Sequence, residues 1–255
     1  MSQTFRHPEI LEIARREGRV TVEGLASHFG VTRQTVRRDL SDLAGAGKLE
    51  RVHGGAILPA GVPNIGYAER RDLAAAGKAC IADGAAEAIP DESSVFLGIG
   101  TTTEAVAQAL LRHRNMLAVT NNMNVARILR ENPACEVVVT GGSLRRSDGG
   151  LVGALTMRTI EQFKFDYAVL GCSALDADGD LLDYDVQEAG VNQVIISRSR
   201  CPMLVADATK FERTAPVRIA SLRDVRRFFT DCAPPARVQE LCQAWSTEVH
   251  ICPQE

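Results

Sequence analysis

Residues 31–41 read VTRQTVRRDLS, and this stretch decides the fold of the N-terminal part of the chain. Val36 and Leu40 recur at helical spacing and would face a core, and Leu43 extends the same apolar face. The opposite arc carries the polar side chains Arg33, Gln34, Arg37, Arg38 and Ser41. The sequence therefore predicts a short helix with one buried face and one exposed, basic face.

The residues just before this helix predict another one, over residues 22–29. Thr21 is a suitable N-cap, Leu25 and Phe29 would face a core, and Gly30 ends the helix. Thr32 is then placed to cap the helix that follows. Two helices joined by a short glycine-containing turn, the second with a basic face, form a helix-turn-helix, whose second helix enters the major groove of DNA.

The flanking segments add a third helix and a wing. Residues 8–16 predict an amphipathic helix with Pro8 near its first position, and residues 49–58, LERVHGGAIL, alternate as a small hairpin. The side chains expected to contact DNA are Thr32, Arg33, Gln34, Thr35, Arg37, Arg38 and Ser41 on the helix, with Arg51 and His53 in the wing. Such groups bind base edges or phosphates. A small all-helical domain with solvated arginines is the alternative, but caps, turn and wing together favour DNA binding.

Charge and composition restrict the remaining function classes. The chain has 255 residues and a net charge of −3, which divides into +2 for residues 1–58 and −5 for residues 59–255. DNA contact should therefore be confined to the N-terminal part. There is no apolar run near 18 residues and no apolar stretch typical of a signal peptide, so we expect a cytoplasmic protein that does not enter the membrane.

The seven cysteines form no C-x-x-C pair. They lie at positions 80, 135, 172, 201, 232, 242 and 252, several of them in or beside apolar strands. We expect small buried hydrophobic residues in a reducing compartment rather than a metal or redox site, and we predict neither a metal nor a cofactor.

A proline- and glycine-containing stretch, GGAILPAGVPNIG at residues 54–66, marks the domain boundary. We predict a DNA-binding domain over 1–58, a linker over 59–71 and a second domain over 72–255. In that second domain, short apolar runs alternate with amphipathic helices. The predicted strands are 95–99, 117–120, 137–140, 167–170, 203–206, 228–230 and 249–252, and the predicted helices are 104–112, 123–130, 155–163, 186–197 and 236–245. This pattern predicts an α/β domain with a largely parallel sheet covered on both faces.

Ligands of such sheets bind outside the carboxyl ends of the strands. The first strand leads into Gly100, Thr101 and Thr102 at the start of a helix, where N–H groups, hydroxyls and the helix dipole suit a phosphate. Polar residues also follow other strands: Asn121, then Gly141 and Gly142 before Arg145, then Lys210. Together they favour a small polyhydroxylated phosphate, whereas an ordinary threonine cap and solvated loops are the alternative.

Two acidic stretches need separate interpretation. Residues 176–180, DADGD, resemble the start of a calcium loop, but Leu181 and Gln187 stand where glycine and glutamate are required, so we predict a turn. Asp183, Asp185 and Glu188 precede or begin a helix, where carboxylates stabilise the positive end of the dipole. Accepting hydrogen bonds from ligand hydroxyls is an equally good explanation for them.

These landmarks resemble the DeoR family of bacterial repressors over nearly the whole chain. The matching motifs are VTRQTVRRDL (31–40), HGGA (53–56), GTTTEAVAQAL (100–110), VTNNMNVA (119–126), VTGGSLRRSDGGLVG (139–153) and VADATKF (205–211). TNNMNVA, GGSLRRSDGGLVG and the stretch at 214–219, TAPVRI, are most similar to the glycerol-3-phosphate branch of that family.

The resemblance implies a sensor domain with a fold like ribose-5-phosphate isomerase and coenzyme A-transferase, and a homo-oligomer. It implies an effector pocket formed by Gly100, Thr101, Thr102, Asn121, Gly141, Gly142, Asp183, Glu188 and Lys210. Arg145, which follows the third strand end, is a further expected effector contact. Two positions depart from the family: Gly98 stands where Asp is common, and Asn192 stands where Lys is usual. The second departure removes a positive charge from near the pocket.

We therefore expect a repressor of double-stranded operator DNA that is released by a phosphorylated metabolite, with glycerol 3-phosphate as the leading candidate. An activator, or a repressor responding to another sugar phosphate, is an alternative. A sugar-phosphate isomerase is a third hypothesis, since Asp183, Glu188 and Lys210 offer a base and an electrostatic stabiliser. An isomerase has no use for residues 1–58, so we expect no enzyme activity.

Overall fold

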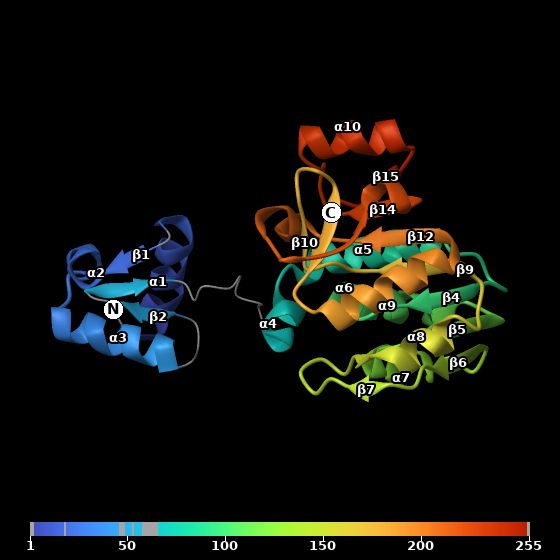
Figure 1. Ribbon diagram of the computed structural model, residues 1–255, viewed down its shortest axis with the longest axis horizontal. Coiled ribbons are helices and arrows are strands. Elements are labelled where there is room, and N and C mark those ends of the chain that lie inside the picture. The colour runs from blue at the N-terminus through green and yellow to red at the C-terminus, as the bar shows by residue number, and fades with distance from the viewer. Residues whose placement is uncertain (1–2, 18, 46–48, 53, 58–65, 254–255) are drawn as a thin grey trace. The chain divides into compact units, whose positions relative to one another are not determined.

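The computed structural model describes residues 3–17, 19–45, 49–52, 54–57 and 66–253. The chain forms two compact units, Met1–Asn64 and Ile65–Glu255, and Figure 1 shows the elements of each. Residues 67–71, which the sequence analysis placed in the linker, belong to a helix of the second unit that spans Tyr67–Asp72.

The described part of the first unit contains three helices and a small antiparallel sheet. Its elements are α1 (Gln3–Glu17), β1 (Arg19–Thr21), α2 (Val22–Phe29), α3 (Arg33–Gly45), β2 (Glu50–Val52) and β3 (Gly55–Ile57). Thr21 caps α2 by accepting a hydrogen bond from Gly24 N, and Gly30 ends it in the left-handed conformation at φ 63°. The sheet order is β1-β3-β2, so the predicted hairpin gains β1 as a third strand.

Helix α1 begins earlier than the sequence predicts, so Pro8 lies inside it rather than near its first position. Proline in a helix removes one backbone hydrogen bond, which normally disfavours that arrangement. A tertiary contact accounts for the longer helix, because Arg6, two residues before Pro8, makes a buried ion pair with Asp39 of α3.

The second unit is built on a seven-stranded parallel sheet with the order β15-β14-β12-β9-β4-β5-β6. The strands are β4 (Ser94–Leu97), β5 (Met116–Thr120), β6 (Cys135–Val139), β9 (Phe165–Leu170), β12 (Ser199–Val205), β14 (Arg227–Thr230) and β15 (Glu248–Ile251). All seven predicted strands are present. Short antiparallel strands add two smaller sheets: β7 (Ser143–Leu144) with β8 (Leu151–Val152), and β10 (Ala174–Leu175), β11 (Asp180–Asp183) and β13 (Val217–Ser221).

Helices cover both faces of the sheet. They are α4 (Tyr67–Asp72), α5 (Ala75–Glu87), α6 (Thr101–Ala109), α7 (Met123–Leu129), α8 (Ala154–Ile160), α9 (Val186–Ser197) and α10 (Ala236–Trp245), with short 3-10 turns η1 (Leu110–Arg112), η2 (Ala208–Glu212) and η3 (Leu222–Asp224). Val95 and Leu97 pack beneath α5, α6 and α7, whereas Phe96 faces α8 and α9. This alternation gives each strand two buried faces, as parallel sheets require.

The strand order places a crevice between β4 and β9. The chain proceeds from β4 to β5 and β6 on one side, and then returns to β9, β12, β14 and β15 on the other. Connections leave the sheet in opposite directions at this point, and ligands of open α/β sheets bind there, outside the carboxyl ends of the strands.

Candidate functional site

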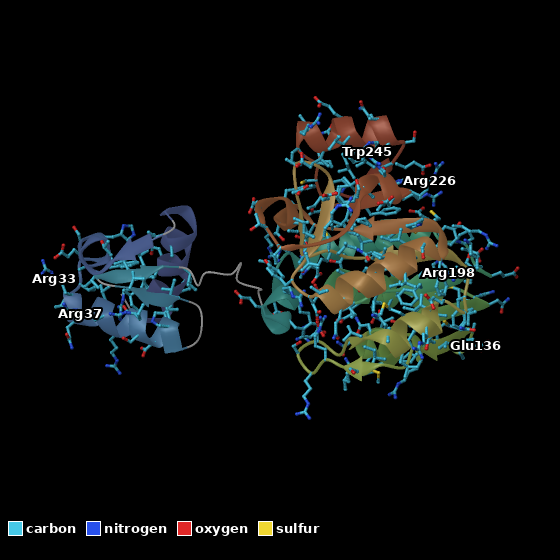
Figure 2. The ribbon with its side chains drawn as sticks, viewed as in Figure 1. Arg33, Arg37, Glu136, Arg198, Arg226 and Trp245 are labelled. Atoms are coloured by element: carbon cyan, nitrogen blue, oxygen red, sulfur yellow. The ribbon has the colours of Figure 1, made fainter. Side chains whose placement is uncertain are left out.

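The outer face of α3 carries the polar side chains that the sequence predicts to contact DNA. Thr32, Arg33, Gln34, Arg37, Arg38 and Ser41 are exposed, and Thr35 is partly buried. Val36, Leu40 and Leu43 on the opposite face are buried in the core of the first unit. Figure 2 shows Arg33 and Arg37 at the surface of α3. The helix therefore has the two faces that reading a DNA groove requires.

Two of the residues predicted to contact DNA, Arg51 and Ser41, also stabilise the first unit. Arg51 Nη1 in β2 donates to the carbonyl of Arg37 and to Ser41 Oγ, both at 3.1 Å. Ser41 Oγ in turn donates to the carbonyl of Arg37 at 2.8 Å. These bonds attach the strand of the wing to α3. His53 lies outside the described residues.

Beneath this surface lies an ion pair that the sequence analysis did not assign. Arg6 of α1 donates to the carboxylate of Asp39 through Nε at 2.7 Å and Nη2 at 3.1 Å, and both residues are buried. Because Asp39 belongs to α3, this bidentate contact fixes the position of that helix against α1.

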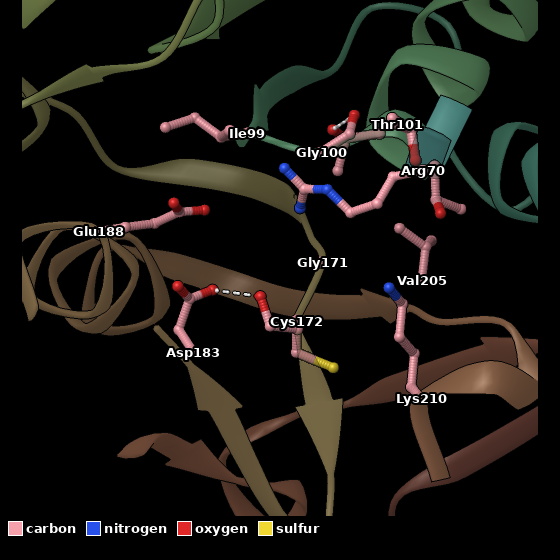
Figure 3. Close-up of a pocket in the computed structure, with 13 residues that line it drawn as sticks. Arg70, Ile99, Gly100, Thr101, Gly171, Cys172, Asp183, Glu188, Val205 and Lys210 are labelled. Carbon is pink, nitrogen blue, oxygen red and sulfur yellow. Dashed lines mark hydrogen bonds between the residues drawn. The ribbon is translucent and has the colours of Figure 1, made fainter. Parts of the chain in front are cut away.

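In the second unit, the crevice between β4 and β9 contains a pocket, seen in Figure 3. Its walls are the segments that follow β4, β9 and β12, together with α4, the end of β11 and the first turn of α9. The lining residues are Arg70, Ile99, Gly100, Thr101, Thr102, Thr103, Gly171, Cys172, Ser173, Asp183, Glu188, Val205 and Lys210. Six predicted effector-binding residues therefore meet in one place: Gly100, Thr101, Thr102, Asp183, Glu188 and Lys210.

The turn before α6 suits an anion. Gly100 adopts φ 148°, a conformation that side chains disfavour, and the helix starts at Thr101. Thr103 donates its hydroxyl to the carbonyls of Gly98 and Gly100, which fixes the turn. The first N–H groups of a helix have no partner within it, and they add to the positive end of the helix dipole. This end of α6 therefore offers donors to a phosphate or carboxylate.

Buried charges of both signs complete the pocket. Lys210 is 9% exposed, and its burial lowers the pKa of the ammonium group. Asp183 accepts hydrogen bonds from Ser173 Oγ at 3.2 Å and from the N–H of Asp185 at 3.0 Å. Burial, together with the charge of Asp183, raises the pKa of Glu188 to about 7 despite the neighbouring Arg145. The ammonium group of Lys210 and the acceptor oxygens of Asp183 and Glu188 can together bind a polar anion.

Arg145 is not among the lining residues, but it contacts one of them, Glu188. It binds Asp148 in bidentate fashion at 2.9 and 2.7 Å, Asp185 at 2.7 Å and Glu188 at 2.5 Å. Burial alone would lower its pKa, but the hydrogen bond with Asp148 and the charge of Glu188 outweigh burial and raise it. Asp185 is the N-cap of α9, so the dipole explanation applies to it, whereas Asp183 and Glu188 face the pocket.

Three other predicted effector residues lie away from the pocket lining. Asn121 follows β5, where its Nδ2 donates to the carbonyl of Leu151 at 3.0 Å. Gly141 and Gly142 follow β6, where a Cβ would approach Leu155 to 2.9 Å and Thr156 Oγ1 to 2.0 Å respectively. Their place in the strand order explains the difference, since β5 and β6 lie on the far side of β4 from the crevice. The two glycines permit close packing against α8.

The two departures from the family pattern lie next to each other. A Cβ on Gly98 would be 3.9 Å from Asn192 Oδ1, and Asn192 is buried. An aspartate at 98 and a lysine at 192 would face one another and offset each other's charge.

Sequence reasoning missed the residues that follow β9, and it missed Arg70. The end of the fourth strand, Gly171-Cys172-Ser173, follows the same rule as the other strand ends and could have been found by it. Arg70 could not, because it belongs to a stretch assigned to the linker. The predicted turn at residues 176–180 is confirmed: Asp176 Oδ1 accepts from the N–H groups of Asp178 and Asp180 between β10 and β11.

The cysteines are all free. Cys172 and Cys242 are buried and four others are partly buried, whereas Cys232 is exposed, so the expectation of a buried side chain is wrong for Cys232. Burial raises the pKa of the Cys172 thiol in the pocket to about 12, so this side chain acts there as a neutral group. Within the described ranges, no cluster of histidine, cysteine and carboxylate side chains could hold a metal, and no helix is long and apolar enough to cross a membrane.

A helix with an exposed basic face on one unit and a polar pocket on the other are the parts expected of a ligand-responsive regulator of DNA. The chain belongs to the DeoR family of transcriptional regulators: residues 6–61 match the DeoR-like helix-turn-helix domain and residues 74–232 the DeoR C terminal sensor domain. The fold thus joins a DNA-binding domain to a small-molecule sensor.

Two relatives with similar sequences agree with this assignment. The chain is 42% identical to the glycerol-3-phosphate regulon repressor of Escherichia coli (strain K12), covering 99% of this chain and 100% of the relative. It is 43% identical to the protein of the same name from Haemophilus influenzae, covering 99% and 98%. Among solved structures, ribose 5 phosphate isomerase A from Neisseria gonorrhoeae is similar with a TM-score of 0.40 and 14% identity, over 56% of this chain and 54% of that one.

The raised pKa of Glu188 predicts a pH-dependent stability. A carboxyl group whose pKa is about 7 in the folded protein, above its ordinary value of 4.5, contributes stability that is fully present below pH 4.5 and is lost as the pH rises through 7. We expect the free energy of unfolding of the wild type, relative to Glu188→Gln, to fall by on the order of 1–3 kcal/mol between pH 5 and 8. Thermal or denaturant unfolding of both proteins across this range measures the difference. A difference that does not change with pH would contradict the assignment.

Proposed function

We propose that this protein is a transcriptional repressor whose affinity for operator DNA falls when glycerol 3-phosphate binds the pocket of the second unit. The pocket at the switch point of the sheet is the observation that supports this proposal most directly. A phosphate suits the N-terminal turn of α6 beside Lys210, and the carboxylates of Asp183 and Glu188 suit the hydroxyl groups of the ligand. The names of the similar proteins support the same ligand.

The proposal also covers the assembly and the place of action. Helix-turn-helix proteins commonly bind two half-sites of a palindromic operator as symmetric oligomers, so we propose a homo-oligomer acting on double-stranded DNA in the cytoplasm. Gly100, Thr101, Thr102, Asp183, Glu188 and Lys210 remain the proposed effector contacts. Arg145 contributes by holding Glu188.

A response to a different phosphorylated polyol or sugar, or activation instead of repression, is the second candidate. The test therefore includes several ligands. A fluorescence-anisotropy titration with an operator fragment, obtained by in vitro selection with this protein, measures release by glycerol 3-phosphate, ribose 5-phosphate and unphosphorylated glycerol. The proposal requires release by glycerol 3-phosphate at lower concentration than by the other two. Equal release by glycerol would refute the role of the phosphate.

Thr102→Val tests where the phosphate binds. Thr102 is 5% exposed at the first turn of α6, and valine keeps its shape but removes the hydroxyl donor. Losing a hydrogen bond to a charged oxygen should weaken effector binding by about 1–3 kcal/mol, so the variant should need a higher effector concentration for release. Operator affinity without effector serves as the check for correct folding. Release at the wild-type concentration would show that the phosphate lies elsewhere.

A further inference from the structure

Arg70 is the one lining residue of the described pocket that comes from α4, outside the sheet and its connections. Figure 3 shows its guanidinium group extending into the middle of the pocket, between Gly100 and Gly171. Helix α4 is also the first helix of the second unit, so it follows the DNA-binding unit directly in the sequence. A ligand bound at Arg70 would therefore be bound to that helix.

Helix α4 is fixed to the sensor core at both ends. At its start, Tyr67 OH donates to Glu104 Oε2 at 2.7 Å and accepts from Asn124 Nδ2 at 3.0 Å. At its end, Lys78 Nζ of α5 donates to the carbonyl groups of Arg70 and Leu73. Lys78 is buried, and burial lowers its pKa to about 8. These contacts hold the backbone of α4 in place without using the Arg70 side chain.

The Arg70 side chain is poorly satisfied where it lies. Its Nε is buried and, in the part of the chain that the structure describes, has no hydrogen-bond partner. Its Nη2 lies 3.8 Å from Asp148 Oδ2, a separation that is longer than a hydrogen bond. The Asp148 carboxylate already accepts two hydrogen bonds from Arg145 and one from the N–H of Gly150.

A guanidinium group carries five N–H donors and stays charged in proteins. Buried donors without acceptors cost free energy, and that cost is recovered when an acceptor binds. Lys210 brings a second positive charge to the same pocket, and the donors of the α6 turn face it. Asp183 and Glu188 are the carboxylates of the lining. The unused donors of Arg70 therefore match an anionic oxygen of a ligand.

We propose that Arg70 binds the anionic group of the effector and thereby attaches α4 to the bound ligand. This inference rests on the proposed function, because it adds a residue and a structural consequence to the same pocket. Among the described residues, α4 is held by hydrogen bonds with Glu104, Asn124 and Lys78. In the occupied pocket the ligand joins α4 to the first turn of α6, so effector binding changes the anchoring of the helix that follows the DNA-binding unit in sequence.

Arg70→Gln tests the contact, and Arg71→Gln is its matched control. Glutamine keeps a polar side chain but removes the charge and the guanidinium fork, whereas Arg71, on the same helix, has a side chain that is 68% exposed. Isothermal titration of the full-length proteins with glycerol 3-phosphate and with ribose 5-phosphate should show at least about tenfold weaker binding for Arg70→Gln. Arg71→Gln should bind like the wild type. Arg70→Lys, which restores charge without the fork, should be intermediate.

The outcomes separate the two proposals. Wild-type affinity for glycerol 3-phosphate in both Arg70→Gln and Arg70→Lys would overturn the role of Arg70 and leave the proposed function intact. If the wild type binds ribose 5-phosphate but not glycerol 3-phosphate, and Arg70→Gln weakens that binding, then glycerol 3-phosphate is not the effector. The proposed role of Arg70 in binding the anionic group is then supported. If the wild type binds neither phosphate, both proposals fail.

Hydrogen–deuterium exchange tests the attachment of α4. Saturating ligand should slow amide exchange in both α4 and α6 of the wild type, because both helices contact it. In Arg70→Gln at saturating ligand, α6 should still be protected while α4 loses its added protection. Thermal unfolding of each variant checks its folding. If the ligand slows amide exchange in α4 as much in Arg70→Gln as in the wild type, the proposed attachment of α4 to the ligand through Arg70 is wrong.

Discussion

Operator binding is expected to weaken by about 1–3 kcal/mol in each of Arg37→Ala and Arg38→Ala, with the largest loss in the double variant. Both arginines lie on the exposed face of α3, opposite the buried Val36 and Leu40. A guanidinium that reads guanine adds sequence preference, whereas one that binds a phosphate adds affinity for any DNA. Anisotropy titrations with the selected operator and with an unrelated duplex of equal length distinguish these roles.

Salt dependence provides the second measurement on the same variants. Each lost phosphate contact should reduce the slope of log affinity against log salt concentration by about one. Arg158→Ala is a suitable control, because it removes the same charge from an exposed position on α8 in the other unit. Wild-type operator affinity that is the same at low and high salt would contradict the electrostatic basis of the interface.

The DNA-binding unit was predictable because its signals are local. Thr21, Gly30 and Thr32 set the ends of two helices within twelve residues, and each does so through contacts with its immediate neighbours. The start of α1 was not predictable in this way. It depends on Arg6 meeting Asp39, which lies 33 residues away in the sequence.

In the sensor unit, too, local features were predictable and features that depend on distant parts of the sequence were not. Each parallel strand was visible as an apolar run, but the order of the strands is a property of the whole sheet. The sequence therefore suggested that Asn121, Gly141 and Gly142 converge with Gly100, although β5 and β6 carry them to the far side of β4. Helix α5 was missed because alanine and glycine dominate it, so its buried face shows little contrast in hydropathy.

The pocket itself was only partly predictable. Residues after β4 and β12 were found because strand ends are readable from hydropathy and glycine. Arg70 was missed because a short, strongly polar helix after a proline-containing stretch is typical of a linker. Only contacts distant in sequence, such as that of Tyr67 with Glu104, place this helix at the pocket.

The ion pair between Arg6 and Asp39 should have the largest effect on stability. Asp39 is 1% exposed and accepts both guanidinium hydrogen bonds, so removing them leaves a carboxylate in the core of a small unit. Arg6→Met should destabilise the first unit by about 3–5 kcal/mol. Arg33→Met removes an exposed arginine from its ion pair with Glu23 and should cost no more than about 1 kcal/mol.

Native-state hydrogen exchange of amides in α1, α2 and α3 measures this free energy for the first unit alone, which matters because the only tryptophan, Trp245, belongs to the second unit. Replacing both partners in Arg6→Met/Asp39→Leu should recover most of the loss, because no charge then remains buried at that position. A double variant as unstable as Arg6→Met would mean that the packing of the arginine stem, rather than the pairing of charges, holds α3 against α1. The position of the DNA-reading helix would then depend on shape, and operator affinity should fall in the double variant as far as in Arg6→Met.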